Sequence, residues 1–163
     1  MPGYLPSTGT LATKLVSVFP GNEGTGLPSH HAVMVVFESD TGAPAAVMDA
    51  AYLTEARTAA GSALATHLLA RPDASIMAVL GTGVQARSHA LAVSRVRPVS
   101  EIRIAGRDER KARRLAEKLS REIRPRVSAV ATYADAVDGA GIVCTTTHAV
   151  DPVLRWEWLA PGT

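Results

Sequence analysis

The sequence predicts an α/β protein in which part of an antiparallel β-rich domain precedes an incomplete doubly wound parallel sheet. Short apolar or β-branched runs separated by turns fill the segment before Asp49, which is typical of antiparallel strands. From Ile76 onward, strand-like and helix-like segments alternate, and this alternation indicates a parallel sheet with right-handed crossovers. We therefore expect two partial domains, over residues 1–70 and 71–163.

The first segment is predicted as an antiparallel meander that leads into one helix. We expect a loop over 1–10, strands over 11–19, 31–37 and 45–48, a flexible loop over 21–28, and a helix over 49–70. Pro20-Gly21-Asn22 and Asp40-Thr41-Gly42 mark the turns. In the helix, apolar residues recur at the spacing of one helix face, and Pro72 follows its end.

The second segment is predicted as four strands and three helices. Strands are expected over 76–80, 101–105, 127–131 and 142–146, and helices over 86–95, 109–123 and 133–137. A complete doubly wound sheet usually has about six strands, so we expect an incomplete sheet with the strand order 3-2-1-4. Trp156 and Trp158 are expected to cover this sheet, and Cys144 to be a buried thiol.

A glycine motif follows the first of these strands. Its residues are Gly81, Thr82, Gly83, Val84, Gln85 and Ala86. Gly81 permits a tight turn, Gly83 lets a pyrophosphate approach the backbone, and Ala86 allows close helix packing, while the helix N-terminus offers N–H groups to phosphates. The motif predicts a Rossmann-type dinucleotide site, and an ordinary structural strand–turn–helix is the alternative.

The residues after the second strand bear on the choice of coenzyme. An acid at the end of that strand accepts hydrogen bonds from the ribose of NAD, but Gly106 stands there, followed by Arg107 and Asp108. A guanidinium suits a 2′-phosphate, so we expect NADP, with NAD as second choice. Arg107 paired with Asp108 or Glu109, or Asp108 reaching the ribose, are the alternatives.

Composition excludes several other classes of function. The net charge is only +2, and the basic run from Arg103 to Arg126 contains interleaved acids and no aromatic residue, so a solvated helix face is favoured over nucleic-acid binding. With Cys144 as the single cysteine, neither an intrachain disulfide nor a CxxC metal site is possible. We expect no metal, no membrane partner, no signal peptide and a cytoplasmic location.

The chain resembles the ornithine cyclodeaminase and mu-crystallin family over essentially its whole length. The motifs that carry the resemblance are Thr13-Lys14-Leu15-Val16, Leu27-Pro28-Ser29-His30, Asp40-Thr41-Gly42-Ala43-Pro44, Met48-Asp49, Leu53-Thr54-Glu55-Ala56-Arg57-Thr58-Ala59-Ala60, the glycine motif, and Asp151-Pro152-Val153. The resemblance implies binding of NAD or NADP and action on amino acids or cyclic imines. Activities in the family include ornithine and lysine cyclodeaminases, alanine dehydrogenases, and ketimine or pyrroline-carboxylate reductases.

The resemblance also implies roles for particular residues. Lys14 would hold the substrate carboxylate, Arg57 and Thr58 would contact cofactor phosphates or substrate, and Ser29 would contact the cofactor. From the residues alone, the alternatives are a surface lysine, a helix-surface salt bridge of Arg57 with Glu55 or a neighbour, and a turn-capping serine. Thr145 and Thr147 end the fourth strand, at the edge where such sheets bind ligands, although they also suit a strand end with no role.

The resemblance also implies two functional residues that have no counterpart in this sequence. Its catalytic acid would lie beyond Thr163 and a substrate arginine before Met1, so the catalytic residue is unknown and the chain resembles the middle of the family fold. A homodimer is expected, because open strand edges promote pairing. The alternatives to an enzyme are a non-catalytic, crystallin-like protein that binds NADP or a small ligand, and a non-functional fragment.

Overall fold

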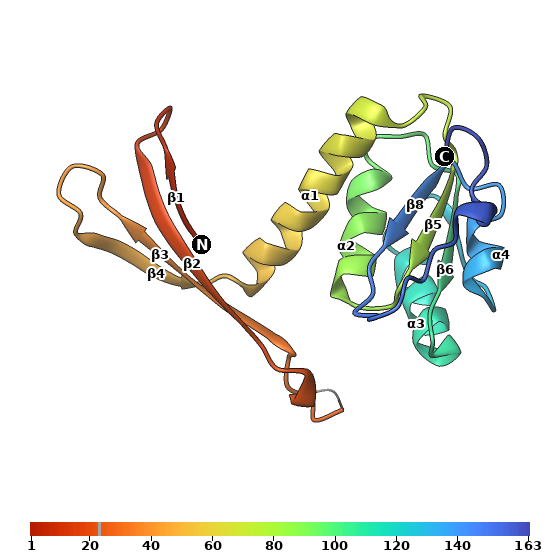
Figure 1. Cartoon of the computed structure of the whole chain (residues 1–163), viewed down its shortest axis with the longest axis horizontal. Helices are drawn as coiled ribbons and strands as arrows, with labels where there is room; N and C mark the ends of the chain where they lie inside the picture. Colours follow the sequence, from red (N-terminus) through yellow and green to blue (C-terminus); the bar gives the residue numbers. More distant parts are fainter. Residues whose placement is uncertain (23) are drawn as a thin grey trace. The chain divides into compact units, whose positions relative to one another are not determined.

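The computed structural model describes residues 1–22 and 24–163, which form two compact units, Met1–Ala56 and Arg57–Thr163 (Figure 1). Helix α1 (Ala51–Leu69) begins in the first unit and continues in the second. The flexible loop expected over 21–28 includes Glu23, which lies outside the described residues. Every helix in the described ranges is too short or too polar to cross a bilayer.

The first unit contains a four-stranded antiparallel sheet in which the strands follow one another in chain order. The strands are β1 (Pro2–Leu5), β2 (Thr10–Val18), β3 (His30–Phe37) and β4 (Pro44–Asp49). This confirms the meander, but the expectation of a loop over 1–10 was wrong. Strand β1 is an edge strand, and its first residue is a proline, a position where the missing N–H disrupts no central ladder.

The two faces of this sheet differ in character. Leu15 on β2 lies opposite Val33 on β3, and Val35 lies opposite Val47 on β4. Because side chains alternate between faces along a strand, these four apolar residues share one face, and Leu15 and Val47 are 61% and 69% exposed. Lys14 lies on the other face of β2 and is buried. The sheet therefore presents an uncovered apolar face opposite Lys14.

The second unit contains a four-stranded parallel sheet of order β7-β6-β5-β8. Its strands are β5 (Ile76–Leu80), β6 (Glu101–Ala105), β7 (Arg126–Ala129) and β8 (Ile142–Thr145). Numbered along this segment, the order is 3-2-1-4, as predicted. Strand β5 lies inside the sheet with neighbours on both sides, so the glycine motif leaves the sheet at its centre.

Helices cover both faces of the parallel sheet, as parallel sheets require. Helices α2 (Val84–Val93) and α3 (Glu109–Ser120) pack on one face, where Ala86, Ala112 and Leu119 join a core with Met77 and Ile104. Helix α4 (Tyr133–Val137) packs on the other face with Leu80 and Ala105. Trp158 also lies against this second core, but Trp156 is 83% exposed, so the prediction that both tryptophans cover the sheet was wrong for Trp156.

Candidate functional site

The turn after β5 is fixed by the end of β8. Gly81 has φ +130°, a conformation that favours glycine, and a Cβ there would lie 2.5 Å from the Thr146 carbonyl oxygen. The Thr146 backbone N–H and hydroxyl both donate to the Leu80 carbonyl, at 2.7 and 3.1 Å. The tight turn expected at Gly81 is present, and its glycine is also required by the close passage of Thr146.

The beginning of α2 suits an anion. Gly83 is the N-cap. Among the described residues, no side chain caps the helix there and, apart from the neighbours of Gly83 in the chain, no atom lies within 4 Å of the place that a Gly83 Cβ would take. The first-turn N–H groups of a helix lack intrahelical partners and carry partial positive charge. Ala86 is fully buried against the sheet, as predicted. Space, N–H groups and close packing therefore fit a pyrophosphate at this turn.

Three other residues of the motif have distinct surroundings. Val84 is exposed at the first position of α2, two residues before the predicted start. The Gln85 side-chain oxygen is buried without a hydrogen-bond partner among the described residues. Thr82 points toward the end of β6, because a Cβ on Gly106 would meet its methyl group at 2.6 Å.

The residues after β6 lie at the same edge of the sheet, because Leu80 and Ala105 are in register. The Asp108 carboxylate accepts a hydrogen bond from the Lys111 backbone N–H at 3.1 Å and caps α3, and this bond lowers the pKa of Asp108. Glu109 pairs with Arg113 at 2.6 Å. Asp108 and Glu109, the two carboxylates that could pair with Arg107, are thus both in contact with other groups. The Arg107 side chain is exposed and has no ion pair within the described part of the chain.

The end of β8 completes this edge. Thr145 is in register with Leu80 and is exposed, and Thr147 accepts a hydrogen bond from the Ala149 N–H at 3.3 Å. Sequence reasoning singled out these two threonines and missed Thr146, which anchors the strand end to Leu80. The glycine turn, Gly106–Asp108 and Thr145 thus share the carboxyl edge of the sheet, where open α/β sheets bind ligands.

In the first unit, Lys14 is a buried cation. It is 7% exposed, and its ammonium donates to the Thr54 hydroxyl at 3.1 Å, while that hydroxyl donates to the Ala50 carbonyl at 2.7 Å. Lys14 forms no ion pair within the described residues. Burying a charge without an opposite charge is costly, so the surroundings of Lys14 favour an anionic ligand. Thr54 was not identified as a site residue from the sequence.

The remaining candidate site residues are Ser29, Arg57 and Thr58. The Ser29 hydroxyl lies 3.1 Å from His30 Nδ1, next to it in the chain. Arg57 is exposed on α1, and no Arg57–Glu55 salt bridge is present in the described ranges. Thr58, on the same helix, is half-buried. Ser29 and Lys14 belong to the first unit, whereas Arg57, Thr58 and the carboxyl edge belong to the second.

Two further side chains are accounted for by packing. His89 is buried between the Ser62 hydroxyl, 2.9 Å from Nε2, and the Gln85 carbonyl, 2.8 Å from Nδ1. Burial raises the pKa of the Cys144 thiol to about 11. No cluster of His, Cys, Asp and Glu suited to a metal ion occurs among the described residues.

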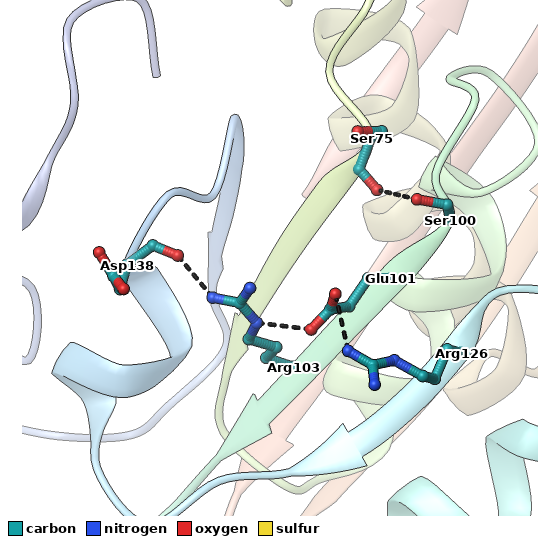
Figure 2. Close-up of polar contacts among 6 residues, drawn as sticks. All are labelled: Ser75, Ser100, Glu101, Arg103, Arg126 and Asp138. Atoms are coloured by element: carbon teal, nitrogen blue, oxygen red, sulfur yellow. Dashed lines mark hydrogen bonds and ion pairs between the residues drawn. The ribbon is translucent and has the colours of Figure 1, made fainter.

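A polar network occupies the opposite, amino edge of the parallel sheet (Figure 2). Glu101, at the start of β6, accepts from Arg103 Nε at 2.7 Å and pairs with Arg126 at 3.0 Å, and Arg103 also donates to the Asp138 carbonyl at the end of α4. Hydrogen bonds from Arg103 and then Arg126 lower the pKa of Glu101. The network therefore links the start of β6 to β7 and to the end of α4.

Comparison with known proteins identifies the family. The model of the ornithine cyclodeaminase/mu-crystallin family matches residues 1–163. The chain belongs to this family. Among its family relatives, the ketimine reductase mu-crystallin of Mus musculus is 38% identical over 162 residues, which are 99% of this chain and 50% of the mouse protein.

Two solved structures of ornithine cyclodeaminase/mu-crystallin relatives have the same fold. Thermococcus litoralis Δ(1)-pyrroline-2-carboxylate reductase, in complex with NADH and L-proline, is 36% identical with a TM-score of 0.97, and the match covers 100% of this chain and 50% of that one. An archaeal alanine dehydrogenase dimer with bound NAD is 32% identical with a TM-score of 0.92, covering 100% and 49%. The chain thus spans about half the length of these relatives.

Proposed function

We propose that the chain supplies the coenzyme-binding edge and the substrate-carboxylate lysine of an NAD(P)-dependent oxidoreductase or cyclodeaminase that acts on amino acids or cyclic imines. The observation that carries this proposal is Lys14, a buried ammonium whose hydrogen-bond partner in the described structure is the neutral Thr54 hydroxyl. The proposal is supported by the mouse relative, a ketimine reductase, and by the Thermococcus reductase, whose structure contains NADH and L-proline.

The proposed roles follow from the chemistry of each residue. The Lys14 ammonium binds the substrate carboxylate, and Thr54 holds that ammonium through its hydroxyl. The α2 N-terminus and Gly83 hold the pyrophosphate. Ser29, Arg57, Thr58, Thr145 and Thr147 are further candidates for coenzyme contact, and Arg57 also for substrate contact. A bound nicotinamide supplies hydride transfer at the α-carbon.

We propose NADP as the preferred coenzyme, with NAD second. Gly106 has no carboxylate for the ribose, and the Asp108 carboxylate is used as the cap of α3. Arg107 is exposed at the same edge and has no ion pair in the described residues. These features favour a 2′-phosphate, although the two solved relatives contain NADH and NAD.

We further propose that the protein forms a homodimer through the exposed apolar face of the first sheet and lies in the cytoplasm. Exposed apolar faces of this kind mark protein interfaces, and the archaeal alanine dehydrogenase is a dimer. Cys144, the single cysteine of the sequence, is half-buried and not fully buried as expected, and the lack of a second cysteine is compatible with a reducing compartment.

The test of the proposed function replaces Lys14. Lys14→Met keeps most of the side-chain length and removes the charge, so binding of L-proline or L-ornithine in the presence of coenzyme should weaken by about 10- to 100-fold, the size of a charge-assisted hydrogen bond. Isothermal titration calorimetry measures the affinity for the amino acid and the affinity for the coenzyme. Coenzyme affinity should be unchanged in the variant.

Lys118→Met serves as the matched control, because Lys118 is an exposed lysine on α3. This control should bind the amino acid and the coenzyme as tightly as the unmodified chain does. Unchanged amino-acid affinity in Lys14→Met would contradict the assignment of Lys14. Turnover of amino acids or cyclic imines with coenzyme distinguishes an enzyme from a non-catalytic binding protein.

A further inference from the structure

We propose that Thr82 determines coenzyme selectivity together with Gly106. In this proposal the Thr82 methyl group occupies the space that a side chain at position 106 would need, and so keeps a carboxylate away from the ribose end of the site. The inference rests on the proposed binding of a pyridine dinucleotide at the carboxyl edge and names the contact that sets the preference there.

The contact joins the ends of two neighbouring strands. Strands β5 and β6 are parallel with Leu80 in register with Ala105, so Thr82 and Gly106 follow adjacent strand ends. A Cβ on Gly106 would lie 2.6 Å from Thr82 Cγ2, but 3.6 Å from Oγ1 and 3.7 Å from Cβ of the same threonine. The first distance is far below van der Waals contact, and the other two are ordinary contacts. The methyl group alone therefore excludes a side chain at position 106.

The turn that carries Thr82 has little freedom to move away. The Gly81 N–H donates to the Ala105 carbonyl at 2.8 Å, and the Thr146 carbonyl oxygen lies 2.5 Å from the place that a Cβ on Gly81 would take. A β-branched side chain is also restricted at χ1, so Thr82 can relieve the contact only by leaving its rotamer. A side chain introduced at position 106 would therefore meet the Thr82 methyl group in a turn that the backbone holds in place.

This contact has a direct consequence for coenzyme choice. A carboxylate at the end of the second strand is the group that binds the ribose hydroxyls of NAD and repels a 2′-phosphate. With Thr82 in place, position 106 has no room for it, and the next residue is the exposed Arg107. Selectivity therefore depends on a residue of the glycine turn and not only on residues that follow the second strand.

The test combines a carboxylate at position 106 with two replacements of Thr82. Thr82→Ser removes only the methyl group, whereas Thr82→Val keeps it. Each is made alone and together with Gly106→Asp, and Gly106→Asp is also made alone. Melting temperature reports the steric conflict, and calorimetric titration with NADPH and with NADH reports the ratio of the two dissociation constants.

We expect Gly106→Asp alone to lower the melting temperature and to gain little NADH affinity. Adding Thr82→Ser should restore the melting temperature and shift the ratio toward NADH by about tenfold or more relative to Thr82→Ser alone, the size of one good hydrogen-bonded contact. Adding Thr82→Val to Gly106→Asp should neither restore the melting temperature nor shift the ratio toward NADH, because the methyl group remains.

Equal rescue by Thr82→Ser and Thr82→Val, or purely additive effects of positions 82 and 106, would overturn the inference. An unmodified chain that binds neither coenzyme would contradict the proposed function, and the selectivity role of Thr82 with it. Retained coenzyme binding with no dependence on Thr82 would contradict only the present inference. The two failures are therefore distinguishable.

Discussion

Among single residues, Arg107 bears most directly on coenzyme choice. We expect Arg107→Ala to weaken NADPH binding by about tenfold or more, because it removes the proposed charge-assisted contact to the 2′-phosphate, and to leave NADH binding unchanged. Titration with both coenzymes measures this. Arg113→Ala is the control, since Arg113 already pairs with Glu109 on the helix surface. Unchanged NADPH affinity in Arg107→Ala, or tighter binding of NADH by the unmodified chain, would refute the NADP assignment.

Cys144 gives a second prediction at this scale. Because burial raises the pKa of its thiol to about 11, the thiolate that reacts with alkylating reagents is scarce at pH 8. Native protein should therefore react with iodoacetamide much more slowly than urea-unfolded protein, as followed by mass spectrometry. Equal rates in the two states would show that the thiol is accessible and that its pKa is not raised.

The candidate site was only partly predictable at the scale of residues. The glycine motif and Gly106–Asp108 are local patterns, and their positions followed from strand order. Lys14 was identified through the family resemblance alone. The contacts that fix the site join residues far apart in the chain: Lys14 and Thr54 are separated by 40 positions, and Leu80 and Thr146 by 66. No local pattern reports such pairs, so Thr54 and Thr146 were missed.

At the scale of elements, the Glu101 network ties β6 to β7 and to the end of α4. Glu101 and Arg103 are 18% and 19% exposed, so Glu101→Gln should lower the free energy of unfolding by about 1–3 kcal/mol, the cost of disrupting a mostly buried charged hydrogen bond. Chemical denaturation measures this. Arg126→Met should cost less, about 0–1 kcal/mol, because Arg126 is 74% exposed.

The contacts of Glu101 with Arg103 and Arg126 also predict that the stability of the fold depends on pH. The folded-state pKa of Glu101 is lowered, so its stabilising contribution is complete above the ordinary value of 4.5 and is lost as pH falls below that value toward the folded-state pKa. The stability difference between the unmodified chain and Glu101→Gln should therefore be constant near neutral pH and should shrink below pH 4.5. A difference that grows on acidification would contradict the role of Glu101.

Elements with strong local signals were predicted best. Strands β5 and β6 and helix α4 have the predicted bounds, since each apolar run or helix cap lies between clear turn signals. Strand β1 was missed because Pro2-Gly3 is unfavourable for a strand by composition, and pairing with β2 overrides that preference. Helix α3 ends at Ser120 and not at Ile123, although Ile123 still packs against the core beyond the helix end.

At the scale of the whole molecule, the exposed apolar face of the first sheet predicts self-association. Light scattering at micromolar concentration should show a dimer, and a charge on that face, as in Leu15→Lys or Val47→Lys, should yield monomer, because a buried lysine without a partner is unfavourable. Val150→Lys, at a fully exposed position outside the sheet, is the matched control. A monomeric unmodified chain would refute the prediction.

The position of β5 between β6 and β8 also has a consequence during synthesis. Strand β6 emerges soon after β5, but the Thr146 anchor of β8 lies 66 residues beyond Leu80. At about 5–20 residues per second, the ribosome takes about 3–13 seconds to cover that interval. Throughout that time the edge of β5 that later pairs with β8 lacks that partner strand, so the pairing of β5 is completed only near the end of this interval.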